Sequence, residues 1–248
     1  MACWDKSGGY IAKSIRDGTI MSMSGHSKWA TIHRQKGVND AKKGAIFTKL
    51  GKAISIAVKQ GQGLQLALEK AKQYNMPKDN IQRALRPTQG ELYEAVFEGF
   101  GPGGVAVMVS VVTDNKLRTG QAIRDVLEKS GGSMGSQGAV AYLFSHEGEI
   151  VAKSNKSVED AELEIIDLGI DDIEAEGDKL LIYCHRDQTF ELKEKIEKMG
   201  YVVDSAELAM KPMALIEVDD EETRNKIEGL LLKLEDLDDV QKVWTNYA

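Results

Sequence analysis

Residues 92–112 read LYEAVFEGFGPGGVAVMVSVV, and this stretch decides the class of fold. Leu92–Phe100 and Val105–Val112 are rich in β-branched and aromatic residues, which favours strands. Gly101-Pro102-Gly103-Gly104 between them predicts a tight turn. Upstream of residue 90 the apolar residues follow a helical period, and downstream of residue 112 short helix and strand patterns alternate. The sequence therefore predicts an α+β protein whose first part is helical.

The part that follows this stretch predicts two small α/β units of ferredoxin-like type. Helices are expected at Leu117–Lys129, Val158–Leu168, Phe190–Met199 and Glu221–Leu234. Strands are expected at Ala139–Phe144, Glu149–Ala152, Ile173–Glu176, Lys179–Cys184, Tyr201–Ala206, Ala214–Val218 and Val240–Thr245. Their order predicts that the second unit is inserted into the first. The expected boundaries are 91–147 with 211–248 for one unit and 148–210 for the other.

The part before residue 91 predicts a basic helical domain over 23–90. Helices are expected over about 40–60, 64–74 and 77–87, separated by glycine and proline. At 100° per residue the first helix has one apolar stripe, made of Ile46, Phe47, Leu50, Ile54, Ala57 and Val58. A lysine stripe lies roughly opposite, made of Lys42, Lys49, Lys52 and Lys59. Two residues depart from this pattern: Lys43 points towards the apolar side and Ile56 towards the lysines.

Residues 1–22 are unlike the rest of the chain. They lack the apolar run of a secretory signal, and with Arg16 beside Asp5 and Asp17 they lack the composition of a mitochondrial transit peptide. We expect a disordered extension, with the start of the folded protein's own sequence near Met21 or Met23.

The charge of the 248-residue chain is strongly divided. Residues 1–90 carry 16 Lys and Arg against 5 Asp and Glu, whereas residues 91–248 carry 16 against 34. The net charge of −7 does not reveal this division. The excess of cations indicates a surface for a polyanion in the first third of the chain. Because no run of 18 apolar residues occurs, no membrane partner is expected. Two cysteines cannot form a disulfide framework, so a reducing compartment is expected.

The cationic stretch from residue 26 to residue 59 is the candidate nucleic-acid site, because cations bind phosphates and release counterions. Asp40 is the only acidic residue among these 34. The candidate contacts are His26, Lys28, Trp29, His33, Arg34, Lys36, Lys42, Lys43, Lys49, Lys52 and Lys59. The alternative interpretation is a solvated helix face. Trp29 could stack on an unpaired base or lie in the core.

Other motifs favour structure over chemistry. The glycine-rich stretch 131–138 could cradle a phosphate, but no Lys-Ser or Lys-Thr follows, so a helix-to-strand connection is the simpler interpretation. The acidic runs 217–222 and 235–239 are expected to be solvated or to bind a basic protein partner, not a metal. Cys184 is expected to be a buried small hydrophobe, with no dyad with His185. No nucleophile signature occurs, so no enzyme, cofactor or metal is predicted.

Several ordered motifs resemble one family. Residues 25–30 (GHSKWA), 40–44 (DAKKG) and 47–50 (FTKL) are similar to the N-terminal signature of the YebC/PmpR family, and 75–81 (NMPKDNI) to its second. Its later motifs resemble 97–104 (FEGFGPGG), 113–115 (TDN), the glycine-rich stretch into 139–142 (AVAY), and 234–241 (LEDLDDVQ). The resemblance covers about 23–248.

The resemblance implies a helical domain and two α/β domains around a cleft, with no cofactor or catalytic site. It implies a cytoplasmic DNA-binding transcriptional regulator. Because one branch of the family is mitochondrial and activates translation, and bacterial members are linked to the ribosome, translation regulation is the alternative. His26, Lys28, Lys42, Lys43 and Lys49 lie in the matched signature. The chain departs from the family pattern at 60–64 and 86–90, where loops are shorter or less basic.

Three hypotheses follow. The first is a non-enzymatic DNA-binding regulator whose lysine stripe contacts phosphates while the acidic C-terminal units lie away from it. The second is a ribosome-associated, RNA-binding translation factor that uses the same stripe on ribosomal RNA. The third, from another class, is an α/β protein that senses a small molecule, or acts on one as an enzyme, through the cleft and the glycine loops.

Overall fold

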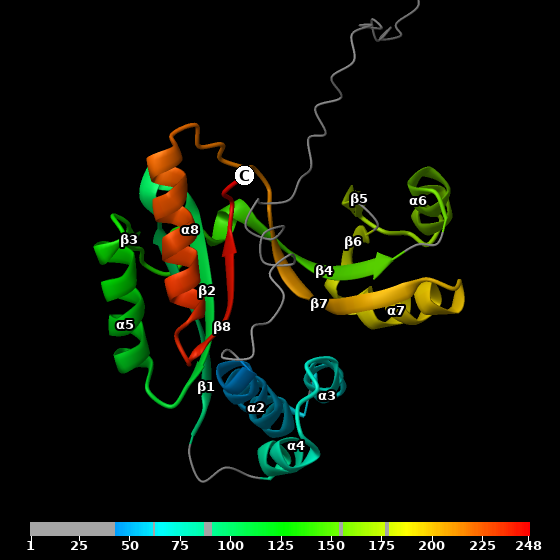
Figure 1. Cartoon of the computed structure of the whole chain (residues 1–248), viewed down its shortest axis with the longest axis horizontal. Helices are drawn as coiled ribbons and strands as arrows, with labels where there is room; N and C mark the ends of the chain where they lie inside the picture. Colours follow the sequence, from blue (N-terminus) through cyan, green and yellow to red (C-terminus); the bar gives the residue numbers. More distant parts are fainter. Residues whose placement is uncertain (1–42, 62, 87–90, 154–155, 177–178) are drawn as a thin grey trace, which may run out of the picture.

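The computed structural model describes residues 43–61, 63–86, 91–153, 156–176 and 179–248 (Figure 1). Its helices are α2 (Lys43–Gln60), α3 (Leu64–Gln73), α4 (Lys78–Leu85), α5 (Lys116–Lys129), α6 (Val158–Ile166), α7 (Thr189–Lys198) and α8 (Glu221–Glu235). Its strands are β1 (Tyr93–Phe100), β2 (Ala106–Thr113), β3 (Ser133–Met134), β4 (Phe144–Lys153), β5 (Asp172–Glu176), β6 (Lys179–His185), β7 (Val202–Pro212) and β8 (Val240–Thr245). The predicted α+β class is confirmed.

The described strands form two antiparallel four-stranded sheets. One has the order β3-β1-β2-β8 and the other β5-β6-β4-β7, so the whole second sheet lies in sequence between β3 and β8. Figure 1 shows α5 and α8 on one face of the first sheet, and α6 and α7 beside the second. The two sheets contact each other where β7 approaches β8.

Strand β2 is rich in valine because both of its faces are buried. Val107, Val109 and Val111 pack with α5 and α8 in the core of the first sheet. On the other face, Ala106 and Met108 pack against a second cluster that includes Phe144. A strand between two cores has no solvent face, so polar alternation is absent from its sequence.

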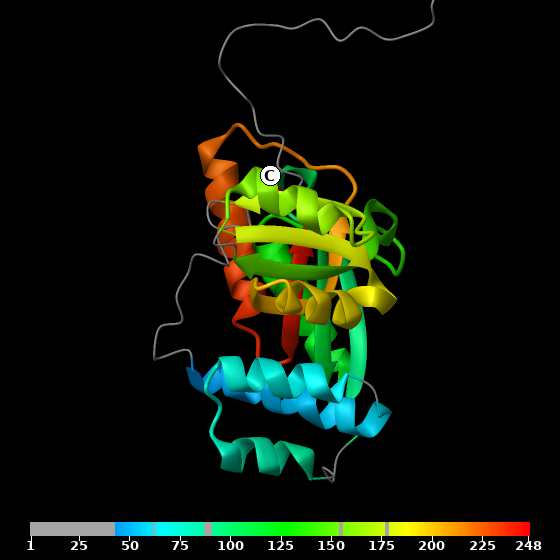
Figure 2. The same ribbon diagram turned by 90° about the vertical axis from the view of Figure 1, so that its right-hand side faces the viewer.

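Helices α2, α3 and α4 share a separate small core. Leu50 and Ile54 from α2 meet Ala71, Met76 and Ala84 from the two following helices and their connection. Leu50 and Ile54 are 6% and 0% exposed, which confirms the predicted apolar stripe. Figure 2 shows these helices stacked at one end of the molecule, below the sheets. The helical unit is thus placed to contact both sheet-bearing parts of the chain.

Two predicted strands are wrong. Residues 139–140 lie in a turn and Ala141–Leu143 form a 3-10 helix, and β4 begins only at Phe144. Their backbone amides turn towards the buried carboxylate of Glu98 and do not form a sheet ladder. The predicted strand at 214–218 makes only an isolated bridge between Ile216 and Tyr247. Most other predicted elements differ from the observed ones by one or two residues at their ends, but strands β4 and β7 are several residues longer than predicted.

Candidate nucleic-acid interface

The lysine side of α2 faces the first sheet over part of its length. Ile56, which departed from the predicted stripe, is only 5% exposed, and α2 contacts strands β2 and β8 of this sheet. An apolar residue among lysines was therefore the sequence signal for a packed face. The expectation of an open lysine stripe therefore fails over part of α2.

Lys49 and Lys52 contact the acidic segment that ends α8. The Lys49 amine donates to the backbone carbonyl of Glu235, and the Lys52 amine lies 2.6 Å from Oδ1 of Asp239 and 3.1 Å from the carbonyl of Asp238. Burial lowers the pKa of Lys49, although Glu235 and neighbouring carboxylates act in the opposite direction. The expectation that the acidic units lie away from this stripe is wrong for these two lysines.

Asp239 connects three elements through one carboxylate. Its Oδ1 binds the Lys52 amine, whereas its Oδ2 accepts a hydrogen bond from the Thr119 hydroxyl at 2.6 Å and lies 3.2 Å from the Arg118 guanidinium. Burial alone would raise the pKa of Asp239, but the hydrogen bonds from Lys52, Thr119 and Arg118 lower it to about 2. Asp239 is therefore ionised at neutral pH and holds α2 against α5 and β8.

Helix α3 makes a second contact, with the inserted sheet. The amine of Lys70 lies 2.7 Å from one Glu207 oxygen, and Lys242 of β8 lies 2.7 Å from the other. Burial would raise the pKa of Glu207, but these two lysines hold it far below its usual range. On the same helix, Glu69 forms a 2.6 Å ion pair with Lys193 of α7. The helical unit and both sheets therefore meet at Glu207.

Only two of the remaining predicted contacts, Lys43 and Lys59, lie among the described residues. Lys59 is exposed, and its amine lies 5.8 Å from the centre of the Tyr93 ring. Lys43 begins α2. The other predicted contacts lie outside the described residues, namely His26, Lys28, Trp29, His33, Arg34, Lys36 and Lys42.

The sequence prediction omitted four exposed cations of the helical unit. Lys72 lies on α3, Lys78 and Arg83 on α4, and Arg86 directly follows α4. Among the described residues none of the four forms an ion pair within 4.0 Å. The prediction ended at Lys59, the last cation of the first predicted helix, although the second signature at 75–81 was a signal that α4 matters.

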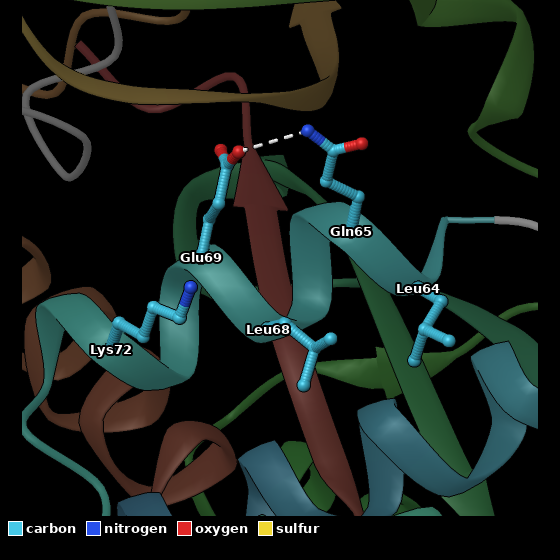
Figure 3. A pocket seen from close by; sticks show the side chains of 5 residues that line it. All are labelled: Leu64, Gln65, Leu68, Glu69 and Lys72. Atoms are coloured by element: carbon cyan, nitrogen blue, oxygen red, sulfur yellow. Dashed lines mark hydrogen bonds between the residues drawn. The ribbon is translucent and has the colours of Figure 1, made fainter.

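Two hollows lie on the helical unit. One, of about 620 Å³, lies between α2 and α4, and its lining includes Phe47, Asn80 and Arg83. The other, of about 430 Å³, is lined by α3 alone (Figure 3). There Leu64 and Leu68 point to one side of the helix, while Glu69 points to the other. Because Glu69 is paired with Lys193, the second hollow offers mainly apolar surface.

The glycine-rich loop binds an anion that belongs to the chain itself. The Glu98 carboxylate accepts from the backbone amides of Gly138, Val140 and Ala141 at 2.7, 2.8 and 2.9 Å. Burial would raise the pKa of Glu98, but these three hydrogen bonds lower it overall. These amides are therefore occupied, and the loop connects helix to strand as predicted.

Other candidate chemistry is limited in the described residues. No cluster of three or more His, Cys, Asp or Glu with metal-site geometry occurs among them. Cys184 is buried, and burial raises the pKa of its thiol, so it matches the predicted small hydrophobe. No helix in the described part of the chain is long and apolar enough to cross a membrane. Asp220 caps α8 by accepting from the amide of Thr223.

Comparison with known proteins decides the family. The model of the TACO1/YebC protein N-terminal domain matches residues 27–91, and that of the TACO1/YebC second and third domain matches residues 92–247. The chain belongs to the TACO1/YebC family. The YebC resemblance seen in the sequence motifs is thereby confirmed.

Similar proteins of the TACO1/YebC family share most of the chain. A protein of Halothermothrix orenii is 41% identical over 240 residues, covering 91% of this chain and 95% of its own. One of Dehalococcoides mccartyi is 44% identical over 237 residues, covering 90% and 94%. Both are named "Probable transcriptional regulatory protein". The crystal structure of a conserved hypothetical protein from Aquifex aeolicus matches with a TM-score of 0.78 at 37% identity, covering 84% of this chain and 91% of that one.

Proposed function

We propose that this chain is a non-enzymatic regulator of gene expression that binds duplex DNA through phosphate contacts of its helical unit. The names of its relatives support a role in regulating transcription. The observation that carries DNA binding is the charge of the helical unit. Of the two acidic residues in 43–86, Glu69 is paired with Lys193, whereas several cations are exposed.

Within this proposal the predicted contacts divide into two groups. Lys49 and Lys52 hold the helical unit against the first sheet, so they contribute little to binding while those contacts persist. The cations of residues 26–43 and the exposed Lys59, together with Lys72, Lys78, Arg83 and Arg86, contact phosphates. Such contacts position a protein on DNA without reading bases, so sequence preference would have to arise elsewhere.

The proposal is tested by retention of duplex DNA across a salt series. We expect about five of these cations to contact phosphates at the same time, which gives a slope of log K against log salt near −4 to −5. The double variant Lys36→Glu with Lys42→Glu should reduce affinity at least about ten-fold and make the slope shallower by about two. No retention at low salt, or a slope near zero, contradicts the proposal.

A matched control reverses two exposed lysines of the sheet-bearing units. Lys198→Glu with Lys226→Glu makes the same change in net charge on α7 and α8. We expect it to change DNA affinity less than about two-fold, since long-range charge is screened at physiological salt. An equal loss in both double variants would show that net charge alone acts. Tighter binding of a ribosomal RNA fragment at equal salt would contradict duplex DNA as the ligand.

A further inference from the structure

The hollow between α2 and α4 unites two motifs that were singled out in the sequence for different reasons. One wall carries Phe47 and Thr48 from the stretch 47–50, and the other carries Met76 and Asn80 from 75–81. The stretches lie far apart in sequence, and helix packing brings them to one groove of about 620 Å³. Grooves of this size hold small organic groups.

The groove has an apolar floor and a polar, basic rim. Met76 and Ala84 at the floor are 7% and 8% exposed, and Phe47 lies partly buried beside them. Ser55 and Asn80 supply polar atoms, and Lys52 and Arg83 supply positive charge. None of the described residues that line the groove is acidic. The charge of the lining therefore complements an anion that carries a flat apolar group.

Each part of a nucleotide has a counterpart in this lining. A base has an apolar face that packs on aromatic and thioether groups, as Phe47 and Met76 provide. The Asn80 amide both donates and accepts hydrogen bonds, as the edge of a base requires. The Arg83 guanidinium matches a phosphate, and it is exposed. Because Lys52 is already paired with Asp239, Arg83 is the main cation available at the rim.

We propose that the groove between α2 and α4 holds one unpaired nucleotide of bound DNA, with its base on Phe47 and Met76 and its phosphate at Arg83. This inference rests on the proposed function and adds to it. Contacts to phosphates alone do not distinguish paired from unpaired DNA, whereas an occupied groove makes the protein prefer a site with an extruded base. Extrusion is easiest where the base has no partner.

Gly51 makes it possible to block the groove without damaging the helix. It lines the groove in the middle of α2, where a Cβ would lie 4.0 Å from Cε of Met76, an ordinary contact. Glycine inside a helix is unfavourable by about 1 kcal/mol relative to alanine. A larger residue at this position should therefore keep or raise stability while its side chain enters the groove.

The experiment compares three labelled DNA duplexes: one fully paired, one with a single unpaired thymidine, and one with an abasic site in place of that thymidine. Stacking of one base predicts that the protein binds the unpaired-thymidine duplex at least about five-fold more tightly than either of the others. Gly51→Leu should abolish this preference and leave affinity for the paired duplex unchanged. Gly51→Ala, the matched control, should retain the preference.

A second pair of variants tests the phosphate contact. Arg83→Gln should reduce the preference for the unpaired thymidine, whereas Arg86→Gln, an equal loss of charge just beyond α4, should not. Equal affinity of the wild-type protein for all three duplexes overturns the groove proposal and leaves DNA binding in place. Binding to none of them, nor to a single-stranded thymidine oligomer, overturns both proposals. Tighter binding to the RNA equivalent overturns the assignment to DNA.

Discussion

The glycine-rich stretch 131–138, with the residues that directly follow it, and the helical unit both present groups that bind anions. They differ in what already occupies those groups. In the loop, three backbone amides bind the carboxylate of Glu98. In the helical unit, Lys52 binds Asp239, but Arg83 has no such partner among the described residues. Glycine or lysine in a sequence indicates that an anion could bind. The fold decides whether a carboxylate of the chain itself already occupies that anion-binding group.

The largest expected effect comes from emptying the loop. Glu98→Ala leaves the amides of Gly138, Val140 and Ala141 without their acceptor, and an unsatisfied buried donor costs about 1–3 kcal/mol. Because water can reach part of the loop, we expect a loss of about 3 kcal/mol in the free energy of unfolding, measured in urea.

The control for this prediction lies on the same strand. Glu94 is exposed, and Glu94→Ala should change stability by no more than about 0.5 kcal/mol. If the loop amides do form an anion site, inorganic phosphate should raise the melting temperature of Glu98→Ala more than that of the wild type. A Glu98→Ala variant as stable as Glu94→Ala would remove the contrast between loop and helices.

Acid should weaken the occupied sites. The pKa of Asp239 is about 2 in the folded protein, below the ordinary value of about 3.8. A lowered folded-state pKa stabilises the fold above the unfolded-state pKa, and this stability is lost as the pH falls through the folded-state value. We expect about 2 kcal/mol from Asp239 to be lost between about pH 4 and pH 2.

Urea unfolding at pH 7, 4, 3 and 2 measures this dependence. Asp239→Asn should reduce the loss in the free energy of unfolding between pH 4 and pH 2. Asp187→Asn, at a carboxylate that is 76% exposed, should not reduce it. An equal loss of stability at acid pH in the wild type and in Asp239→Asn would show that the Asp239 contacts are weak in solution.

Local signals made most of the fold predictable from the sequence. Glycine and proline marked the ends of α2, α3 and α4, and the helical period identified the buried face with Leu50 and Ile54. The strand expected at 139–144 failed because its local pattern gave no sign that a buried carboxylate from β1 would bind its amides. That interaction depends on residues about 40 positions apart in sequence.

The candidate site was less predictable than the fold. Cationic residues were recognised, but which of them are paired depends on distant contacts, such as the one between Lys52 and Asp239 across 187 positions. Periodicity places a side chain on one face of a helix and does not say what packs there. Ile56 was the one residue whose position among the lysines indicated a packed face. Arg83 was overlooked because it lies on α4, beyond the basic stretch 26–59.

The smallest expected effect concerns the pair that closes α2 onto the first sheet. Lys52 and Asp239 are 22% and 15% exposed at their side chains, so a double-mutant cycle with Lys52→Gln and Asp239→Asn should give a coupling of about 1 kcal/mol. The exposed pair of Lys226 and Glu222 on α8 should give a smaller coupling, because solvent screens both charges.

The same variants, together with Arg83→Gln, distinguish by DNA binding a cation that is paired within the chain, Lys52, from one that is unpaired among the described residues, Arg83. If Lys52 is held by Asp239, Lys52→Gln should change DNA affinity less than about two-fold, whereas Arg83→Gln lowers affinity for the duplex with an unpaired thymidine. Asp239→Asn removes the internal anion, so the Lys52 amine becomes available to phosphate and DNA binding should strengthen with a steeper salt dependence. Weaker binding by Asp239→Asn would mean that DNA requires the closed arrangement of α2 on the sheet, and the pairing of Lys52 would then support binding instead of competing with it.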